Sequence, residues 1–226
     1  MKNLEIYIHI PFCVRKCEYC DFLSFPADDD AKLRYVKGLM AEMIFYGPLM
    51  KNYQVSSVYI GGGTPSSIDE QWIAALMEGV FDCFNVLPDA EISIECNPGT
   101  LSREKLLAYR DAGINRLSIG LQSANNDELK LLGRIHTFEQ FVTNYEVARN
   151  VGFKNINVDL MYGLPGQSAS QYMATVNKII RLHPDHISAY SLIVEKGTPF
   201  YEKYKFDMVR QEAGMRTEFL PNEDEL

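Results

Sequence analysis

Three cysteines stand close together near the N-terminus in the order CxxxCxxC, at Cys13, Cys17 and Cys20. A structural zinc site usually takes four ligands in two distant pairs, and the sequence shows no second pair at such a spacing. A thioredoxin-like redox pair at Cys17 and Cys20 is an alternative, but that motif should open a helix and it leaves Cys13 without a role. An iron–sulfur cube normally takes four thiolates. Three thiolates leave one iron open to an outside ligand, by the logic that separates catalytic from structural metal sites.

The two remaining cysteines are expected to be structural. Cys83 falls in a predicted helix, and Cys96 is predicted to face the helix-covered side of its strand, away from Glu95. Free cysteines are among the most buried residue types. An odd total of five cysteines also argues against a disulfide framework and for a reducing compartment.

The composition narrows the class of protein. The chain has 226 residues, 46% of them hydrophobic, and a net charge of −8, which predicts one globular domain with a core of useful size. An acidic chain has no basic field for phosphate backbones or anionic lipid, so we expect no nucleic-acid partner and no membrane-surface partner. No stretch approaches the roughly 18 apolar residues of a membrane span, and the N-terminal residues lack a signal sequence. We expect a soluble, cytoplasmic protein.

Apolar segments alternate with amphipathic ones along the chain, which predicts strands alternating with helices. The predicted strands are residues 5–10, 56–62, 91–97, 114–122, 155–163 and 186–194. The predicted core-facing helix residues are Leu33, Val36, Met40 and Ile44, and Trp72, Leu76, Val80 and Phe84. Capping boxes are predicted at Thr137 with Gln140 and at Ser168 with Gln171, and left-handed helix ends at Gly113 and Gly152. The order of elements predicts an α/β fold with a parallel sheet.

The predicted strands are polar on one face and apolar on the other. In residues 91–97, Glu91, Ser93 and Glu95 alternate with Ile92 and Ile94, and three other strands show the same pattern. A doubly wound sheet is covered by helices on both faces and should be apolar on both, and solvated edges would explain one or two strands but not four. An open barrel covers only its outside and places its site at the carboxyl ends of the strands. We therefore predict a partial (β/α)6 TIM-like barrel with a polar lumen.

Seven segments in sequence order resemble one known family. They are YIHIPFCVRKCEYCDF at 7–22, YIGGGTPSSI at 59–68, IECNPGT at 94–100, NRLSIGLQS at 115–123, LGRIHT at 132–137, NVDLMYGLPGQ at 157–167 and SAYSLIVEKGTPFY at 188–201. Across residues 4–201 the chain is similar to the radical S-adenosylmethionine (SAM) proteins of the oxygen-independent coproporphyrinogen III oxidase-like family. The resemblance implies the radical SAM partial barrel, a [4Fe-4S] cluster and SAM at its open iron.

The resemblance also implies roles for individual residues. Cys13, Cys17 and Cys20 would bind the cluster, with Tyr19 packed beside it. The positions that match SAM contacts are Tyr7, Gly62, Glu95, Gln122, Arg134 and Asp159, and those that match a second SAM are Gly63, Thr64 and Ile193. Arg134 can pair with the methionyl carboxylate, and the glycines at 61–63 would let backbone carbonyls approach the SAM amino group. Among the histidines, His9 and His136 could touch a ligand, but neither is chosen as a site residue.

Radical SAM chemistry passes one electron from the cluster to SAM and yields methionine and a 5′-deoxyadenosyl radical. The resemblance therefore implies an electron donor such as flavodoxin or ferredoxin. Whether this chain retains such chemistry, and so whether it is an enzyme, stays open at this point.

Phe22 distinguishes two branches of the family. The oxidase motif continues as CxxxCxxCxC, whereas this chain has Phe22 at the position of the fourth cysteine. The sequence Cys20-Asp21-Phe22 resembles the heme chaperone (HemW) branch, whose members bind heme and deliver it to acceptor proteins. We expect a heme chaperone with heme or porphyrin as ligand and a heme-acceptor protein as partner. The alternative is an oxygen-independent coproporphyrinogen III oxidase, and a structural metal module without SAM would leave GGGTP, Gln122 and Asp159 without a role.

Two regions are expected along the chain. Residues 1–201 are predicted to form the barrel core, and residues 202–226 a short helix and an acidic tail. Members of the family continue into a C-terminal domain that covers the mouth of the barrel. We find no counterpart of it after Tyr201, and we expect a truncated product whose barrel mouth is partly uncovered.

Overall fold

The protein contains one sheet of six parallel strands in the order β1-β2-β3-β4-β5-β6, which confirms the predicted half-barrel. This computed structural model describes residues 2–222, so the end of the predicted acidic tail lies outside the described residues. The strands are β1 (Lys2–Ile10), β2 (Tyr53–Gly62), β3 (Val86–Cys96), β4 (Arg116–Gln122), β5 (Asn155–Tyr162) and β6 (His186–Ser191). The α-helices are α1 (Asp29–Tyr46), α2 (Glu70–Cys83), α3 (Arg103–Asp111), α4 (Asn126–Leu131), α5 (Phe138–Asn150), α6 (Ala169–Ile180) and α7 (Pro199–Glu212). Short 3₁₀ helices span Gly47–Met50, Pro65–Ser67 and Pro98–Thr100.

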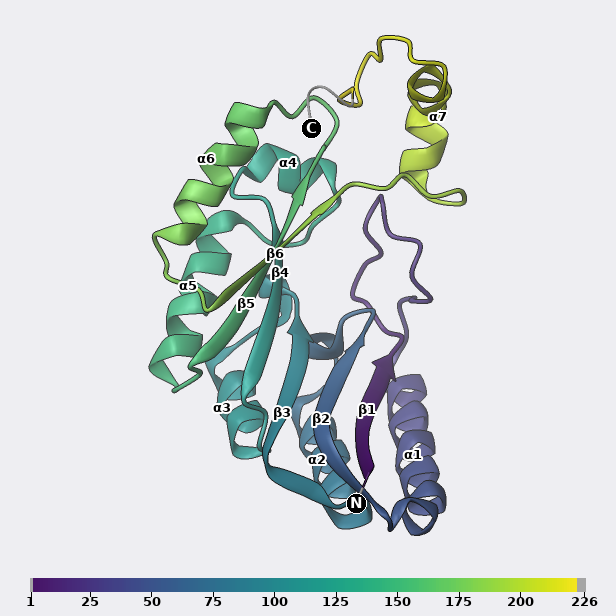
Figure 1. The fold of residues 1–226 in the computed structure, drawn as a ribbon, viewed down its shortest axis with the longest axis vertical. Coiled ribbons are helices and arrows are strands. Elements are labelled where there is room, and N and C mark those ends of the chain that lie inside the picture. The colour runs from purple at the N-terminus through teal and green to yellow at the C-terminus, as the bar shows by residue number, and fades with distance from the viewer. Residues whose placement is uncertain (1, 223–226) are drawn as a thin grey trace.

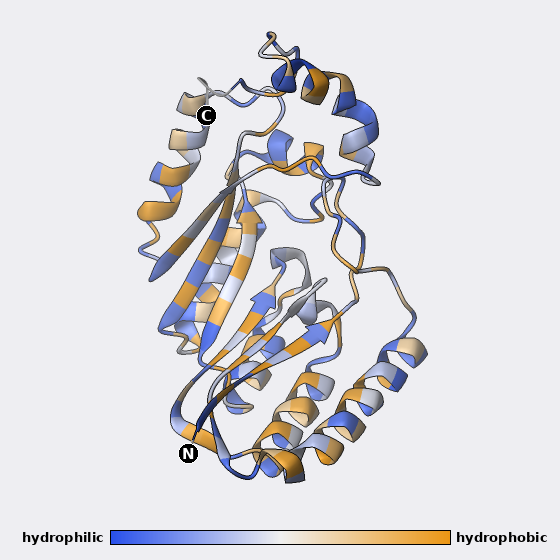
Figure 2. Ribbon diagram, turned by 45° about the vertical axis from the view of Figure 1, so that its right-hand side comes forward, coloured by the Kyte–Doolittle hydropathy of each residue, from blue (hydrophilic) through white to orange (hydrophobic). Residues whose placement is uncertain are grey.

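The helices between the strands cover one face of the curved sheet, while the loop after β1 rises beside α7 at the carboxyl ends of the strands (Figure 1). The covered face carries the core. Ile10, Ile60, Ile94, Ile119 and Val158 come from five successive strands and are fully buried there. Hydrophilic and hydrophobic residues alternate along the strands (Figure 2), as side chains that point to opposite faces must.

The opposite face of the sheet is polar, as predicted, and its buried groups are hydrogen-bonded to one another. The Asn157 side-chain amide donates to Ser118 Oγ at 2.8 Å. The oxygen of the same amide accepts from Ser188 Oγ at 3.1 Å and lies 2.5 Å from His186 Nδ1. This network links β4, β5 and β6 on the lumen side, and it gives His186 a structural role.

The predicted helix signals are confirmed. Thr137 and Ser168 each form a complete capping box with the glutamine three residues later. Gly113 and Gly152 adopt φ angles of +89° and +107°, the left-handed conformation that ends a helix at little cost only with glycine.

One predicted core position is wrong. Ile44 is 68% exposed, and Met43 takes the core position next to Val36 on α1. Seven residues turn an α-helix through almost two full turns, leaving an offset of only about 20°. Met43 therefore shares the face of Val36, whereas Ile44 is rotated away toward solvent.

The predicted strands are confirmed, with shifted ends. The largest shift is in β3, which begins at Val86 where residue 91 was predicted. Pro88 and Asp89 disfavour a strand in sequence analysis, yet Val86 pairs with Val55 before a register shift in β2. At the other edge, β6 ends at Ser191, three residues earlier than predicted.

Residues 199–220 pack against the top of the barrel. Phe200, Tyr204 and Leu220 join Leu132 and Leu164 in a second apolar cluster. The carboxylate of Asp207 on α7 accepts hydrogen bonds from the backbone N–H groups of residues 218 to 220, which folds the segment after α7 back onto that helix. Between residues 2 and 222, none of the helices has the length and apolar character needed to cross a membrane.

Candidate functional site: a cysteine loop above polar strand ends

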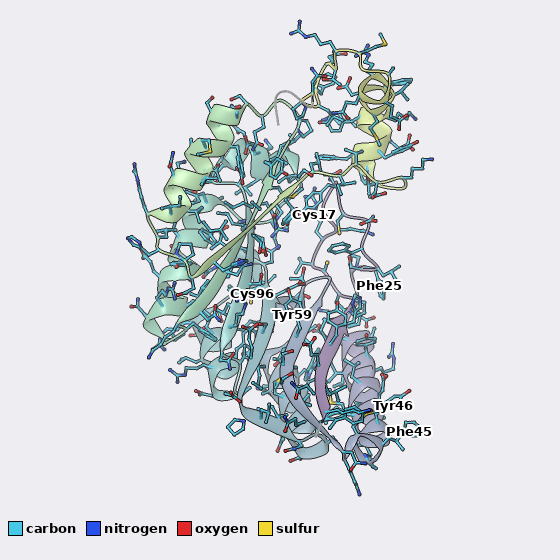
Figure 3. The ribbon with its side chains drawn as sticks, viewed as in Figure 1. Cys17, Phe25, Phe45, Tyr46, Tyr59 and Cys96 are labelled. Carbon is cyan, nitrogen blue, oxygen red and sulfur yellow. The ribbon has the colours of Figure 1, made fainter. Side chains whose placement is uncertain are left out.

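The cysteine loop, residues 11–28 between β1 and α1, is fastened by backbone hydrogen bonds within itself and to other segments. Within the loop, Cys13 N donates to Phe25 O at 3.2 Å and Phe25 N donates to Pro11 O at 3.0 Å. Glu18 N donates to Leu132 O at 3.1 Å, and Glu18 O accepts from Phe200 N at 3.0 Å. These bonds tie the loop to the segment after α4 and to the start of α7. Figure 3 shows Cys17 above the strand ends and Cys96 at the end of β3.

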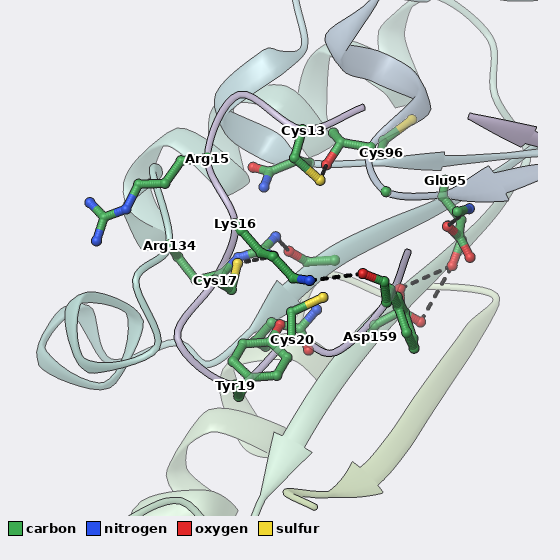
Figure 4. A pocket seen from close by; sticks show the side chains of 18 of the residues that line it. Cys13, Arg15, Lys16, Cys17, Tyr19, Cys20, Glu95, Cys96, Arg134 and Asp159 are labelled. Carbon is green, nitrogen blue, oxygen red and sulfur yellow. Dashed lines mark hydrogen bonds between the residues drawn. The ribbon is translucent and has the colours of Figure 1, made fainter. Parts of the chain in front are cut away.

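A cavity of about 200 Å³ lies between the cysteine loop and the carboxyl ends of the strands. Cys13, Cys17 and Cys20 enter it from the loop, and Glu95 and Asp159 approach it from β3 and β5 (Figure 4). The remaining predicted site residues in its lining are Tyr19, Gly62, Gly63, Thr64, Gln122 and Arg134. The fold thus brings together the predicted site residues except Tyr7 and Ile193; Ile193, which matches a position of the second SAM, is 65% exposed and does not line the cavity.

Tyr7 is 59% exposed and does not line this cavity. Its hydroxyl lies 2.9 Å from His9 Nδ1, and its ring stacks on Tyr59 with centroids 6.2 Å apart. Tyr7 sits on the lumen face of β1 but three residues before the strand ends at Ile10. Its place is therefore deeper in the half-barrel than the cysteine loop.

Glu95 is held in place by two donors. Tyr59 Oη donates to Glu95 Oε1 at 2.8 Å, and Gly62 N donates to Glu95 Oε2 at 3.1 Å. Burial raises the pKa of the Glu95 carboxyl above its ordinary value, while these two hydrogen bonds oppose the shift. The group is thus a half-buried acceptor whose orientation is fixed by two donors.

Asp159 is held by donors from the polar face of β4 and β5. Ser118 Oγ donates to Asp159 Oδ2 at 3.1 Å, and the Asn157 amide donates to Asp159 Oδ1 at 2.7 Å. Burial raises the pKa of the Asp159 carboxyl, again against these hydrogen bonds. Two half-buried carboxyl groups therefore face one cavity, and neither forms a salt bridge with any of residues 2–222.

Arg134 lines the same cavity. Its Nη2 donates to Gly120 O at 2.5 Å and its Nη1 donates to Cys17 Sγ at 3.6 Å. Burial alone would lower the pKa of Arg134, but the adjacent Tyr19 and Cys17 groups outweigh burial and raise it. Its Nε is buried and has no hydrogen-bond partner in the described part of the chain.

Gln122 has an unusual backbone for a residue with a side chain. Its φ angle is +76°, in the left-handed region that residues other than glycine seldom adopt. The β4–β5 register shifts between Gly120 and Gln122, and Tyr190 Oη donates to Gln122 Oε1 at 2.6 Å. Strained backbone of this kind is typical of ligand sites.

The glycines at 61–63 have no room for a side chain in this structure. A Cβ at Gly61 would lie 2.8 Å from the Tyr59 ring, and one at Gly62 would lie 2.7 Å from the His9 ring. At Gly63 a Cβ would lie 2.8 Å from Phe12 O and 3.0 Å from Cys13 Sγ. Protein atoms fill the space beside each glycine, so the run allows β1 and the cysteine loop to pack closely on the end of β2.

Several lining residues were not singled out as site residues from the sequence, among them Lys16, Asn97, Ser118, Gly120 and Tyr190. The strand alternation could have found Ser118 and Gly120, which share a face with Gln122, and Tyr190, which follows His186 and Ser188 at intervals of two. Nothing in the sequence pattern marks Lys16, whose Nζ donates to Phe22 O across the cysteine loop at 2.9 Å.

His136, Cys83 and Cys96 pack against other protein groups in the structure. His136 is buried between Asn97 Oδ1 and Leu121 O, and burial together with the nearby Arg134 lowers its pKa to about 3. It is a neutral structural group. Cys96 is 5% exposed and belongs to the core cluster, and Cys83 packs against the same cluster, as predicted.

The chain belongs to the radical SAM superfamily, whose family model matches residues 7–179. Proteins of this superfamily use a [4Fe-4S] cluster and SAM. The chain is 40% identical to the heme chaperone HemW of Bacillus subtilis over 196 residues, which cover 86% of this chain and 52% of that protein. It is 37% identical to the heme chaperone HemW of Escherichia coli over 229 residues, which cover 99% of this chain and 56% of that protein.

The chain thus spans about half the length of the curated relatives it matches. Among solved structures, it resembles the coproporphyrinogen III oxidase of Escherichia coli with a TM-score of 0.85 and 29% identity, over 99% of this chain and 49% of that one. Streptococcus suis SuiB bound to S-adenosylmethionine shares the fold, with a TM-score of 0.63 and 19% identity over 93% of this chain and 48% of that one.

The residues around the cavity fit a cluster and SAM. Cys13, Cys17 and Cys20 are free thiols on one loop. Two half-buried carboxyl groups and an arginine whose Nε has no partner among the described residues line the same cavity. Within residues 2–222, no three His, Cys, Asp or Glu side chains converge on a point that could hold a single metal ion. An iron–sulfur cube does not need such convergence, because each thiolate binds a different iron.

Proposed function

We propose that this chain is the cluster- and SAM-binding core of a heme chaperone, a protein that binds heme and transfers it to acceptor proteins. The observation that carries this proposal is the identity of 40% and 37% to heme chaperones over most of this chain. Because the chain covers about half of each relative, heme binding and heme transfer are both part of the proposal.

Phe22 supports a chaperone rather than an oxidase. It lines the cavity next to Cys20, and 63% of its surface is exposed. By resemblance, the oxidase has a cysteine at this position. A phenyl ring supplies no thiol, but an exposed aromatic face suits contact with the flat apolar surface of a porphyrin.

The oxidase is the second candidate because of the structural similarity to coproporphyrinogen III oxidase, with a TM-score of 0.85. The carboxyl groups of Glu95 and Asp159, which would bind SAM in either protein, line the cavity in this chain. The two candidate functions therefore share one cluster- and SAM-binding core and differ in what happens to the porphyrin ligand.

In both cases we assign the same cofactor ligands. Cys13, Cys17 and Cys20 would hold the cluster, which supplies one electron to SAM when bound. Glu95 and Asp159 can accept hydrogen bonds from ammonium or ribose hydroxyl groups, and Arg134 can donate to a carboxylate. The remaining proposed cofactor contacts are Tyr7, Tyr19, Gly62, Gly63, Thr64 and Gln122.

A cluster that is to be reduced needs an electron donor, such as flavodoxin or ferredoxin, and we include that partner in the proposal. The cytoplasm is the proposed location. All five cysteines are free, and thiols persist in that state in a reducing compartment.

One comparison separates the two functions. The chain is reconstituted with iron and sulfide without oxygen, together with a Phe22→Cys variant and a Cys20→Ala variant that lacks one proposed ligand. We expect one [4Fe-4S] cluster per wild-type chain, a spectrum that changes when SAM is added, and saturable heme binding. Given SAM, a reductant and coproporphyrinogen III, the wild type should form no protoporphyrinogen. Stoichiometric decarboxylated product would make this protein an oxidase, and absence of heme binding would exclude the chaperone.

A further inference from the structure

Two of the three proposed cluster ligands accept a hydrogen bond from a side chain outside the cysteine loop. Thr64 Oγ1 donates to Cys13 Sγ at 3.3 Å. Arg134 Nη1 donates to Cys17 Sγ at 3.6 Å, a longer distance that is normal for the larger sulfur atom. By resemblance, Thr64 and Arg134 match SAM positions, whereas in this structure each of them contacts a thiol.

The position of Thr64 is fixed by its own backbone. Thr64 N donates to Phe12 O at 2.8 Å, and Gly63 N donates to Ile10 O at 2.8 Å, so the end of β2 is bonded to the residues that lead into Cys13. Any side chain at Gly63 would meet Phe12 O and Cys13 Sγ. The glycine therefore lets the threonine hydroxyl reach the thiol.

The position of Arg134 is fixed from a different part of the fold. Its second guanidinium nitrogen, Nη2, donates to Gly120 O near the end of β4. One residue earlier, Gly133 has φ +74°, and a Cβ there would lie 3.0 Å from Glu18 Cγ. Arg134 thus reaches Cys17 from a segment that is packed directly against the cysteine loop.

We propose that Thr64 and Arg134 are positioning residues that hydrogen-bond the cluster thiolates of Cys13 and Cys17 and thereby set the reduction potential of the cluster. A donor on a ligating sulfur withdraws negative charge from it, and reduction adds one electron to the cluster. The donor therefore stabilises the reduced cluster more than the oxidised one and raises the potential. This inference rests on the assignment of the three cysteines as cluster ligands.

Thr64→Val removes the hydroxyl and nearly keeps the shape of the side chain. The reconstituted variant is titrated without SAM and without heme, with dithionite as the reductant and redox mediators, and its midpoint potential is read from the absorbance of the cluster. We expect a potential more negative than that of the wild type. Thr64→Ser keeps the O–H donor and should restore the wild-type potential.

Ser67→Ala is the matched control. Ser67 lies in the same turn and donates to Phe12 O at 3.2 Å, but it does not contact a thiol. Its loss should leave the potential unchanged. A purely structural role for this turn predicts equal effects for Thr64→Val and Ser67→Ala, and that result would overturn the proposal.

Arg134→Gln and Arg134→Lys test the second donor. Gln removes the charge, and Lys keeps the charge but not the planar fork that reaches both Gly120 O and Cys17 Sγ. Both variants should shift the potential to more negative values, Gln further than Lys. The resonance Raman frequency of the terminal Fe–S stretch should rise in each variant that loses a donor, since the bond to the thiolate strengthens.

The outcomes distinguish this inference from the function proposed above. If the wild type assembles no cluster, the ligand assignment and this inference both fail. If clusters assemble in the wild type and the variants with equal potentials and equal Fe–S stretches, this inference fails while the chaperone proposal stands. If Thr64→Val cannot hold a cluster, the two Arg134 variants still decide, because wild-type potentials in both would reject the role.

Discussion

Asp159 brings a carboxyl group into a cavity where the surrounding residues leave it without a salt-bridge partner among those described. Burial raises its pKa, so between the ordinary pKa of 3.8 and the raised value the folded protein binds more protons than the unfolded chain. Stability must then fall as the pH rises through this interval. Ionisation of the Asp159 carboxyl therefore destabilises the cofactor-free protein, and a bound cation or hydrogen-bond donor would offset this destabilisation.

We predict that Asp159→Asn makes the cofactor-free protein more stable at neutral pH, by about 1.4 kcal/mol for each pH unit by which the Asp159 pKa is raised. The advantage should vanish at a pH below 3.8, where the wild-type carboxyl is protonated in both states. Urea unfolding of both proteins from acid to neutral pH measures it. The exposed Asp89→Asn serves as the control, and an equal gain there would remove Asp159 as the cause.

The three clustered thiols and the two structural ones should respond differently to the same change. Cys13→Ala, Cys17→Ala and Cys20→Ala are each expected to abolish cluster assembly, because each removes the ligand of one iron. Cys96→Ala should keep the cluster and cost only core packing, since Cys96 is 5% exposed in the main core. Iron and sulfide content per chain decides this, and loss of iron from Cys96→Ala would contradict the separation of the two sets.

At the scale of elements, the cysteine loop packs directly on the end of β2. We predict that Gly63→Ala impairs cluster assembly and lowers stability, because its Cβ would lie 2.8 Å from the backbone oxygen of Phe12. Gly38→Ala is the opposite case, since Gly38 lies inside α1 with no atom within 4 Å of its Cβ position.

Replacing a helical glycine should stabilise the protein by about 0.5–1 kcal/mol. Thermal unfolding and iron content of the two variants test the pair. Normal cluster content in Gly63→Ala would show that the loop does not need this close contact.

The sequence predicts the features that follow from the alternation of side chains along a strand. It does not predict features that depend on a contact between residues far apart in the chain. Because successive side chains of a strand point to opposite faces, the sequence correctly placed Cys96 in the core and Glu95 toward the lumen. It could not show that β3 begins at Val86, because pairing with Val55 overrides Pro88. The place of Lys16, whose ammonium group crosses the loop to Phe22 O, likewise depends on the folded loop.

Tyr7 is a proposed SAM contact, yet it does not line the cavity of this structure. The resemblance gives it to SAM, but in this structure it pairs with His9 and stacks on Tyr59. The difference arises because a residue three positions before the end of β1 lies below the level of the cysteine loop. Matching motifs identify which residues belong to a site, whereas their depth along the strands has to come from the structure.

For the whole molecule, the cavity is the place where residues from both edges of the open sheet would contact the same ligand. Its lining comes from the cysteine loop after β1, from β3 to β5 and from Tyr190 on β6, with Gly62 at the end of β2. The six strands are joined only in sequence order, and β1 and β6 do not pair. A cluster with SAM would therefore connect the two edges of the half-barrel, whose strands do not pair with each other.

This arrangement predicts that SAM stabilises the whole domain only after the cluster is in place. A ligand that binds the folded state alone contributes about 2.7 kcal/mol at a concentration 100 times its Kd. For a domain of roughly 200 residues, that corresponds to a rise in Tm of several degrees. Anaerobic scanning calorimetry with and without SAM should show the rise in the reconstituted wild type and not in Cys20→Ala, which lacks one cluster ligand. An equal rise in both would mean that SAM is bound by the strand ends without the open iron, and that the three thiols serve another purpose.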